Sequence, residues 1–103
     1  MEIVENLYAQ LHRHYRLSQS DYSKHWLKKG KEYFAYLQSS KSKANVDVLL
    51  GIYGEALKQK ALWENTGKNK NGTDKAVYEQ HTGFFENIVR TAENAIKKQA
   101  LSM

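Results

Sequence analysis

The chain contains no proline, and only six of its 103 residues are glycine. These two residue types interrupt helices most often, because proline lacks a backbone donor and glycine loses the most conformational entropy. Apolar side chains also recur at spacings of three and four, as at Val4, Leu7 and Leu11, which is the period of one helical face. The sequence therefore predicts an all-α fold, and its 41% hydrophobic content suffices for one core.

The first half of the chain predicts three helices. One spans residues 2–15 and ends before a polar stretch. Ser18 can cap the next helix, since its hydroxyl accepts from orphan N–H groups, and Asp21 follows three residues later as in a capping box. Gly30 then breaks the apolar pattern, and a third short helix is expected over residues 31–39.

The second half predicts two longer helices, which brings the expected total to five. Asn45 is the expected cap of the fourth. The segment ENTGKNKNGTDK, residues 64–75, is polar and carries turn signals, so it is interpreted as an exposed linker loop. The chain is thus expected to form a core over residues 1–63 and a C-terminal helix over residues 76–103, within a single domain.

Composition excludes several classes of protein. The chain has no cysteine, which excludes disulfides and thiolate metal sites. No apolar run approaches the ~18 residues that a membrane span needs, and the N-terminus does not resemble a secretory signal, so a cytoplasmic protein is expected. The net charge is +5, but residues 12–45 alone hold eight basic and two acidic side chains. This concentration favours an anionic partner.

The segment from Gln19 onward resembles the helix-turn-helix of the lambda-repressor/Cro family. The matching residues are Gln19 at the head of the second helix, Ser23 at its small position, Trp26 and Leu27 at its end, and Phe34 and Leu37 as the buried pair of the third helix. The stretch LQSSKSKANVDVLLGIYGEAL then matches the family's basic loop and following helix, so the resemblance covers residues 2–62. Small bacterial and mobile-element proteins often add a C-terminal helix to this pattern.

Three features depart from the family. The turn is one residue longer than usual, its glycine falls late at Gly30, and Ser23 stands where an alanine is usual. A longer turn can change the orientation of the third helix. Such a change would alter which residues face the bases, but not the fold.

The resemblance implies a double-stranded DNA-binding regulator whose third helix enters the major groove. Residues expected to contact bases are Lys31, Glu32, Ala35 and Tyr36. Residues expected to contact phosphates are Gln19, Lys28, Lys29, Ser40, Lys41, Ser42 and Lys43. Taken without the resemblance, lysines in a turn are more often a solvated face than a nucleic-acid site.

No enzyme is expected. His12 and His14 are two residues apart, so on a helix they point in nearly opposite directions and do not share a metal ion. The sequence also lacks a phosphate-binding glycine loop and a recognisable nucleophile, and no metal or cofactor is predicted.

The last helix carries a second functional argument, because its apolar side chains exceed what a solvated helix leaves exposed. They either complete the core of one chain or pair two chains, and the residues expected at a homodimer interface are Phe84, Phe85, Ile88 and Ile96. The main alternative is a protein-binding adaptor, such as an antitoxin-like or phage-encoded inhibitor that keeps the helix-turn-helix only as a scaffold. An RNA-binding helical module ranks last, because few aromatic side chains are expected on the basic face.

Overall fold

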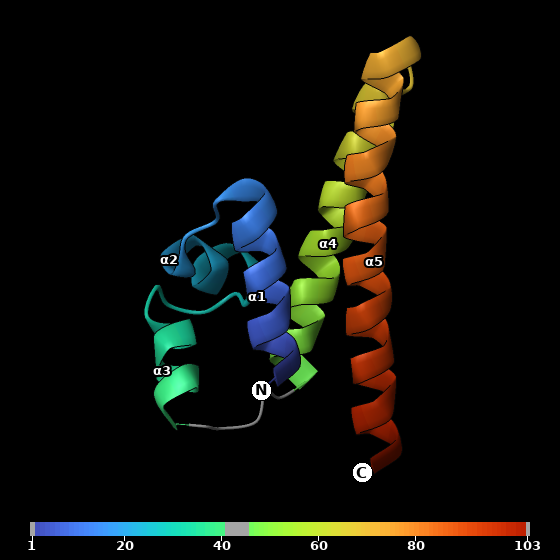
Figure 1. Cartoon of the computed structure of the whole chain (residues 1–103). Helices are drawn as coiled ribbons and strands as arrows, with labels where there is room; N and C mark the ends of the chain where they lie inside the picture. The colour runs from blue at the N-terminus through green and yellow to red at the C-terminus, as the bar shows by residue number, and fades with distance from the viewer. Residues whose placement is uncertain (1, 41–45, 103) are drawn as a thin grey trace. The chain divides into compact units, whose positions relative to one another are not determined.

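The computed structural model describes residues 2–40 and 46–102, and over these residues the protein is all-α, as predicted. No described residue lies in a strand. The elements, in chain order, are α1 (Glu2–Tyr15), α2 (Gln19–Asp21), the π-helical segment η1 (Tyr22–Trp26), α3 (Tyr33–Ser40), α4 (Val46–Gly67) and α5 (Gly72–Ser102) (Figure 1). None of these helices, over their described residues, has a stretch apolar enough to cross a membrane.

The chain forms two compact units, Met1–Ile52 and Tyr53–Met103. The division falls inside α4, and not at the polar segment where the sequence predicted a linker. That prediction was too wide: α4 continues to Gly67 and α5 begins at Gly72, so only residues 68–71 connect the two helices. Polar residues are compatible with helix wherever one side of the helix still packs on a neighbour.

The N-terminal unit packs α1 against η1 and α3. The hydroxyl of Tyr22 is buried and donates to the carbonyl oxygen of Val4, 2.8 Å away. The ring of Tyr8, also on α1, lies 4.8 Å from that of Phe34 on α3. Side chains buried in this unit are Val4, Leu7, Leu11, Tyr22, Ser23, Trp26, Leu27, Phe34, Leu37, Val48, Leu49 and Ile52.

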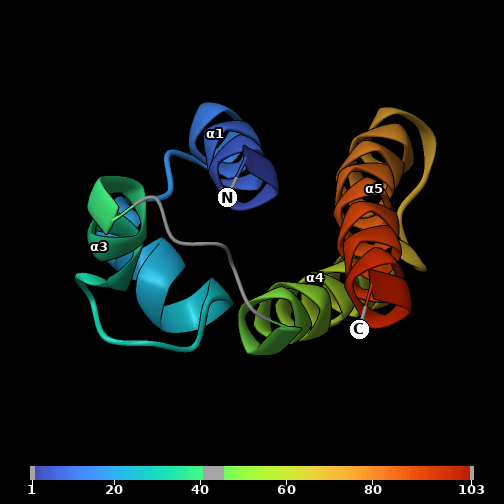
Figure 2. The same cartoon turned by 90° about the horizontal axis from the view of Figure 1, so that it is seen from below.

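The C-terminal unit is a helical hairpin, in which the last part of α4 and α5 run side by side in opposite directions (Figures 1 and 2). Near the turn, the ring of Trp63 on α4 stacks on that of His81 on α5, with centroids 4.1 Å apart. The edge of Tyr78 meets the same Trp63 ring at 5.3 Å. Side chains buried in this unit include Ala56, Phe85, Ile88, Val89 and Ala92.

Candidate nucleic-acid interface

The helix that begins after Ser18 has the predicted cap. The Ser18 hydroxyl accepts a hydrogen bond from the backbone N–H of Asp21, at 3.1 Å. One turn later the helix widens, because the N–H of Leu27 donates to the carbonyl of Tyr22, five residues back. This π-helical turn was not predicted, and the apolar spacing of the sequence carries no signal for it.

The π-helical turn places Tyr22, Ser23 and Trp26 on the buried side, and Leu27, which follows it, is buried as well. It ends where Lys28 adopts a left-handed backbone conformation, with φ of 59°. The N–H of Lys29 then donates to the carbonyl of Ser23 at 2.9 Å, which closes the end of the segment. The turn that follows is thus fixed at its first residues by backbone hydrogen bonds.

Ser23, the residue that departs from the family pattern, joins the two short helices directly. Its buried hydroxyl accepts a hydrogen bond from the backbone N–H of Phe34, at 2.9 Å. Phe34 is the second residue of α3, and N–H groups in the first turn of a helix have no partner within the helix. Ser23 therefore caps α3 from a neighbouring segment, which an alanine cannot do.

Helix α3 has one buried and one exposed side. Phe34 and Leu37 are buried, as predicted, whereas Ala35 and Tyr36 are exposed, with 58% of the Tyr36 surface open to solvent. Tyr33 is half-buried, and its ring centroid lies 6.1 Å from that of Tyr36.

Lys31 and Glu32 are exposed but lie in the turn before α3, because the helix begins at Tyr33 and not at residue 31 as predicted. The carbonyl of Glu32 accepts from the N–H of Tyr36 at 3.0 Å, so Glu32 is the residue that leads into the helix. All four residues predicted to contact bases are thus exposed at or just before α3.

The residues predicted to contact phosphates lie around α3 in the same unit. Gln19 is exposed at the first residue of α2, Lys28 is exposed at the end of η1, and Ser40 is exposed at the last residue of α3. Lys29 is half-buried, with its Nζ 5.6 Å from the centre of the Tyr33 ring, an arrangement that holds the charge beside α3. Lys41, Ser42 and Lys43, like the predicted cap Asn45, lie outside the described residues.

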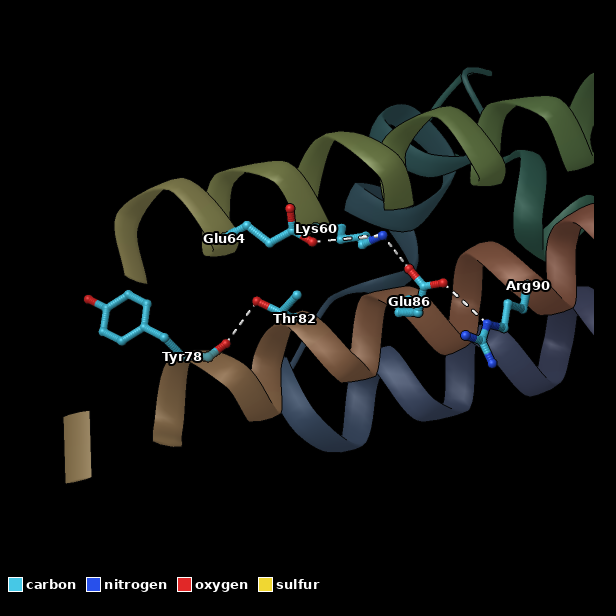
Figure 3. A network of polar contacts seen from close by, with 6 residues as sticks. All are labelled: Lys60, Glu64, Tyr78, Thr82, Glu86 and Arg90. Carbon is cyan, nitrogen blue, oxygen red and sulfur yellow. Dashed lines mark hydrogen bonds and ion pairs between the residues drawn. The ribbon is translucent and has the colours of Figure 1, made fainter. Parts of the chain in front are cut away.

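The hairpin carries a group of charged residues that sequence reasoning missed (Figure 3). The Nζ of Lys60 on α4 forms an ion pair with Oε2 of Glu86 on α5, and the other carboxylate oxygen of Glu86 accepts from Arg90 at 3.2 Å. The bond from Lys60 lowers the pKa of Glu86 and raises that of Lys60. Lys60 and Glu86 are far apart in the sequence, so no spacing rule could join them. Their ion pair links α4 to α5 within the hairpin.

The predicted dimer residues differ in exposure. Phe85 and Ile88 are buried within the single chain, and Phe84 and Ile96 are half-buried. The Phe84 and Phe85 rings meet edge to face at 5.2 Å. Of these four residues, Phe84 and Ile96 therefore keep part of their surface open to solvent.

Helix α4 buries only part of its apolar side chains, a narrow set that contains Leu49, Ile52 and Ala56. It leaves Leu50, Leu57 and Leu62 49%, 40% and 51% exposed, respectively.

Residues 4–101 match the model of a family described as "Family of unknown function (DUF6626)". No curated protein and no solved structure matches the chain.

Proposed function

We propose that this chain, which belongs to the family of unknown function DUF6626, is a sequence-specific DNA-binding regulator. It reads the major groove with the exposed side of α3 and represses transcription in the bacterial cytoplasm as a homodimer. It has no enzymatic activity of its own.

The observation that carries this proposal is the two-sided character of α3. Phe34 and Leu37 fix one side in the core, and the Ser23 hydroxyl holds the first turn of the helix. The opposite side remains exposed at Ala35 and Tyr36. A short helix that is rigidly anchored and bare on its outer face is what readout of a groove requires.

The exposed groups are chemically suited to base edges. Lys31 can donate to guanine O6 and N7, and Glu32 can accept from the cytosine amino group. The methyl group of Ala35 can contact the methyl group of thymine. Because each of these pairings discriminates one base from another, the proposal includes sequence preference and not only attraction to a polyanion.

The basic residues around α3 supply the phosphate contacts. Lysines and short hydroxyl side chains suit phosphate oxygens, and each neutralised phosphate releases a counterion. If about six phosphates are contacted, log K should fall with log salt at a slope of roughly −5.

The test of DNA binding is a fluorescence-anisotropy titration with random duplex at several salt concentrations. The double variant Lys28→Gln and Lys31→Gln should weaken binding and make the slope shallower by about one, because Lys28 is assigned to a phosphate and Lys31 to a base. The matched control is Lys68→Gln with Lys75→Gln, which removes the same charge from exposed positions in the C-terminal unit. No binding by the unaltered chain, or equal losses in both double variants, contradicts the proposal.

Base readout is tested separately by selection on randomised duplexes. The variant Lys31→Ala with Tyr36→Ala should select a different or degenerate site, because both side chains are exposed at α3. An unchanged preferred site would show that other residues read the sequence.

A protein-binding adaptor is the second candidate, and the exposed Leu57 and Leu62 on α4 favour it. An adaptor would use the N-terminal unit only as a scaffold. The anisotropy titration separates the two candidates, since an adaptor binds duplex DNA weakly or not at all, and Lys28→Gln with Lys31→Gln leaves it unaffected.

A further inference from the structure

Three positions among the described residues have a left-handed backbone. They are Arg16, Lys28 and Gly72, with φ of 58°, 59° and 60°. Glycine is the residue that adopts this conformation without strain, because it has no Cβ. The chain follows this rule at the start of α5, where Gly72 stands, but places basic residues at both such positions of the N-terminal unit.

The surroundings of Arg16 impose its conformation. Its N–H donates to the carbonyl of His12 at 2.8 Å and closes the end of α1. The next residue is held as well, since His12 Nδ1 lies 2.9 Å from the carbonyl oxygen of Leu17 and, as a protonated nitrogen, donates to it. Ser18 then caps α2. The strained backbone is therefore fixed on both sides, while the Arg16 side chain is exposed.

The helix dipole does not explain the choice of arginine. A cation near a helix C-terminus is favourable, but the last turn of α1 already holds His12, Arg13 and His14. A glycine at position 16 would end α1 without strain and keep those three basic side chains in place. Arg16 has a strained backbone at a position where glycine would avoid the strain. This points to a role for the Arg16 side chain.

We propose that Arg16, three residues before Gln19 in the chain, is a further phosphate-contacting residue of the DNA-binding surface. This inference rests on the proposed function, because it names an additional contact of the same surface. A guanidinium offers several donors in a planar fork that matches phosphate oxygens. Because the Arg16 backbone is fixed between α1 and α2, less conformational entropy is lost when the residue binds.

The test compares Arg16→Gly and Arg16→Lys by thermal unfolding and by anisotropy titration on random duplex. Arg16→Gly should leave the Tm unchanged or raise it, since the strain is relieved, yet weaken binding several-fold at about 0.1 M salt and reduce the salt slope by about one. Arg16→Lys keeps the charge but not the planar fork, so it should keep the salt slope and lose only part of the affinity. Lys68→Gln, which removes one exposed charge elsewhere, should change neither quantity appreciably.

The outcomes separate the two proposals. If Arg16→Gly binds with unchanged affinity and slope while Lys28→Gln with Lys31→Gln does not, Arg16 only ends α1 and the inference is wrong, whereas DNA binding stands. If the unaltered chain does not bind duplex DNA, both proposals are overturned. If Arg16→Gly lowers the Tm, the titration is repeated with Arg16→Asn, because asparagine also tolerates the left-handed region. The salt slope of that variant is then judged in the same way.

Discussion

Individual side chains decide how the two short helices of the N-terminal unit are held. The hydroxyl of Ser23 accepts from the first turn of α3, and the hydroxyl of Tyr22 donates to α1. Burial raises the pKa of Tyr22 well above its ordinary value, so the donor stays protonated. Two adjacent residues thus connect η1 to both of its neighbours.

Replacing Ser23 with alanine should lower the free energy of unfolding by about 1–3 kcal/mol, because the buried N–H of Phe34 loses its acceptor. Urea unfolding followed by circular dichroism measures this cost. Ser39→Ala is the matched control, since Ser39 is exposed and its hydroxyl only donates to the carbonyl of Tyr36 within the same helix. A change of less than about 0.5 kcal/mol is expected there, and equal effects at both positions would contradict the capping role of Ser23.

At the scale of elements, the first turns of α4 approach the end of η1 closely. A Cβ added at Gly51 would lie 2.7 Å from the carbonyl oxygen of Trp26, whereas one added at Gly54 would have no neighbour within 4 Å. It is therefore Gly51, and not Gly54, that lets α4 pack closely against the end of η1.

Gly51→Ala should destabilise the protein by about 1–3 kcal/mol, because a backbone carbonyl must move. Gly54→Ala should stabilise it by about 0.5–1 kcal/mol, since alanine favours the helix and meets no obstacle. Thermal unfolding of the two variants should therefore show Tm shifts of opposite sign. A rise in Tm for both would mean that α4 does not approach η1 in this way.

The hairpin is held by the ion pair between Lys60 and Glu86, which lowers the pKa of that carboxyl. A group whose pKa is lower in the folded state contributes stability at pH values above its unfolded pKa, near 4.3, and this contribution disappears as the pH falls. Glu86→Gln should therefore make the stability of the protein less dependent on pH below about 5.

The comparison is made by thermal unfolding between pH 3 and 7. Glu93→Gln serves as the control, because Glu93 forms an ion pair with Lys97 along α5 and not with α4 in the part of the chain that the structure describes. If the acid dependence is the same in Glu86→Gln as in the unaltered chain, the ion pair does not stabilise the hairpin.

At the scale of the whole molecule, the basic segment and the predicted dimer residues lie in different units. Residues 12–45, in the N-terminal unit, hold eight basic and two acidic side chains, whereas the half-buried Phe84 and Ile96 lie on α5. The proposed homodimer therefore uses α5, and the proposed DNA contacts use α3.

Sedimentation equilibrium should then show a mass approaching twice 11.9 kDa as the concentration rises. Footprinting on a selected site should reveal two half-sites about one helical turn apart. Phe84→Ser, at a half-buried position, should shift the equilibrium toward the single chain. A single-chain mass at all concentrations, together with one half-site, would rule out the homodimer.

Much of the fold follows from local rules. The spacing of Leu7 and Leu11 gives α1, Ser18 gives the cap of α2, and the i, i+3 pair Phe34 and Leu37 gives the buried side of α3. These signals depend only on neighbours in the chain, which is why they can be read from it. The sequence-based prediction was wrong where contacts between distant parts of the chain decide the structure. Residues 64–67 are an example, because they were predicted to lie in a linker but are helical.

The candidate site was predicted less completely than the fold. Exposure of Lys31, Glu32, Ala35 and Tyr36 was expected, but the later start of α3 places the first two in a turn. The left-handed backbone of Arg16 and the pairing of Lys60 with Glu86 had no sequence signal. The pairing of Lys60 with Glu86 depends on atoms that meet only after α4 and α5 have packed.

The sequence alone determined an all-helical protein whose basic side chains are concentrated over residues 12–45, because helix period, capping residues and charge are local properties. The tertiary structure decided which apolar positions of α4 are buried and that Ser23 caps α3. Both depend on the approach of segments distant in the chain, and such approaches are governed by packing that no local pattern encodes.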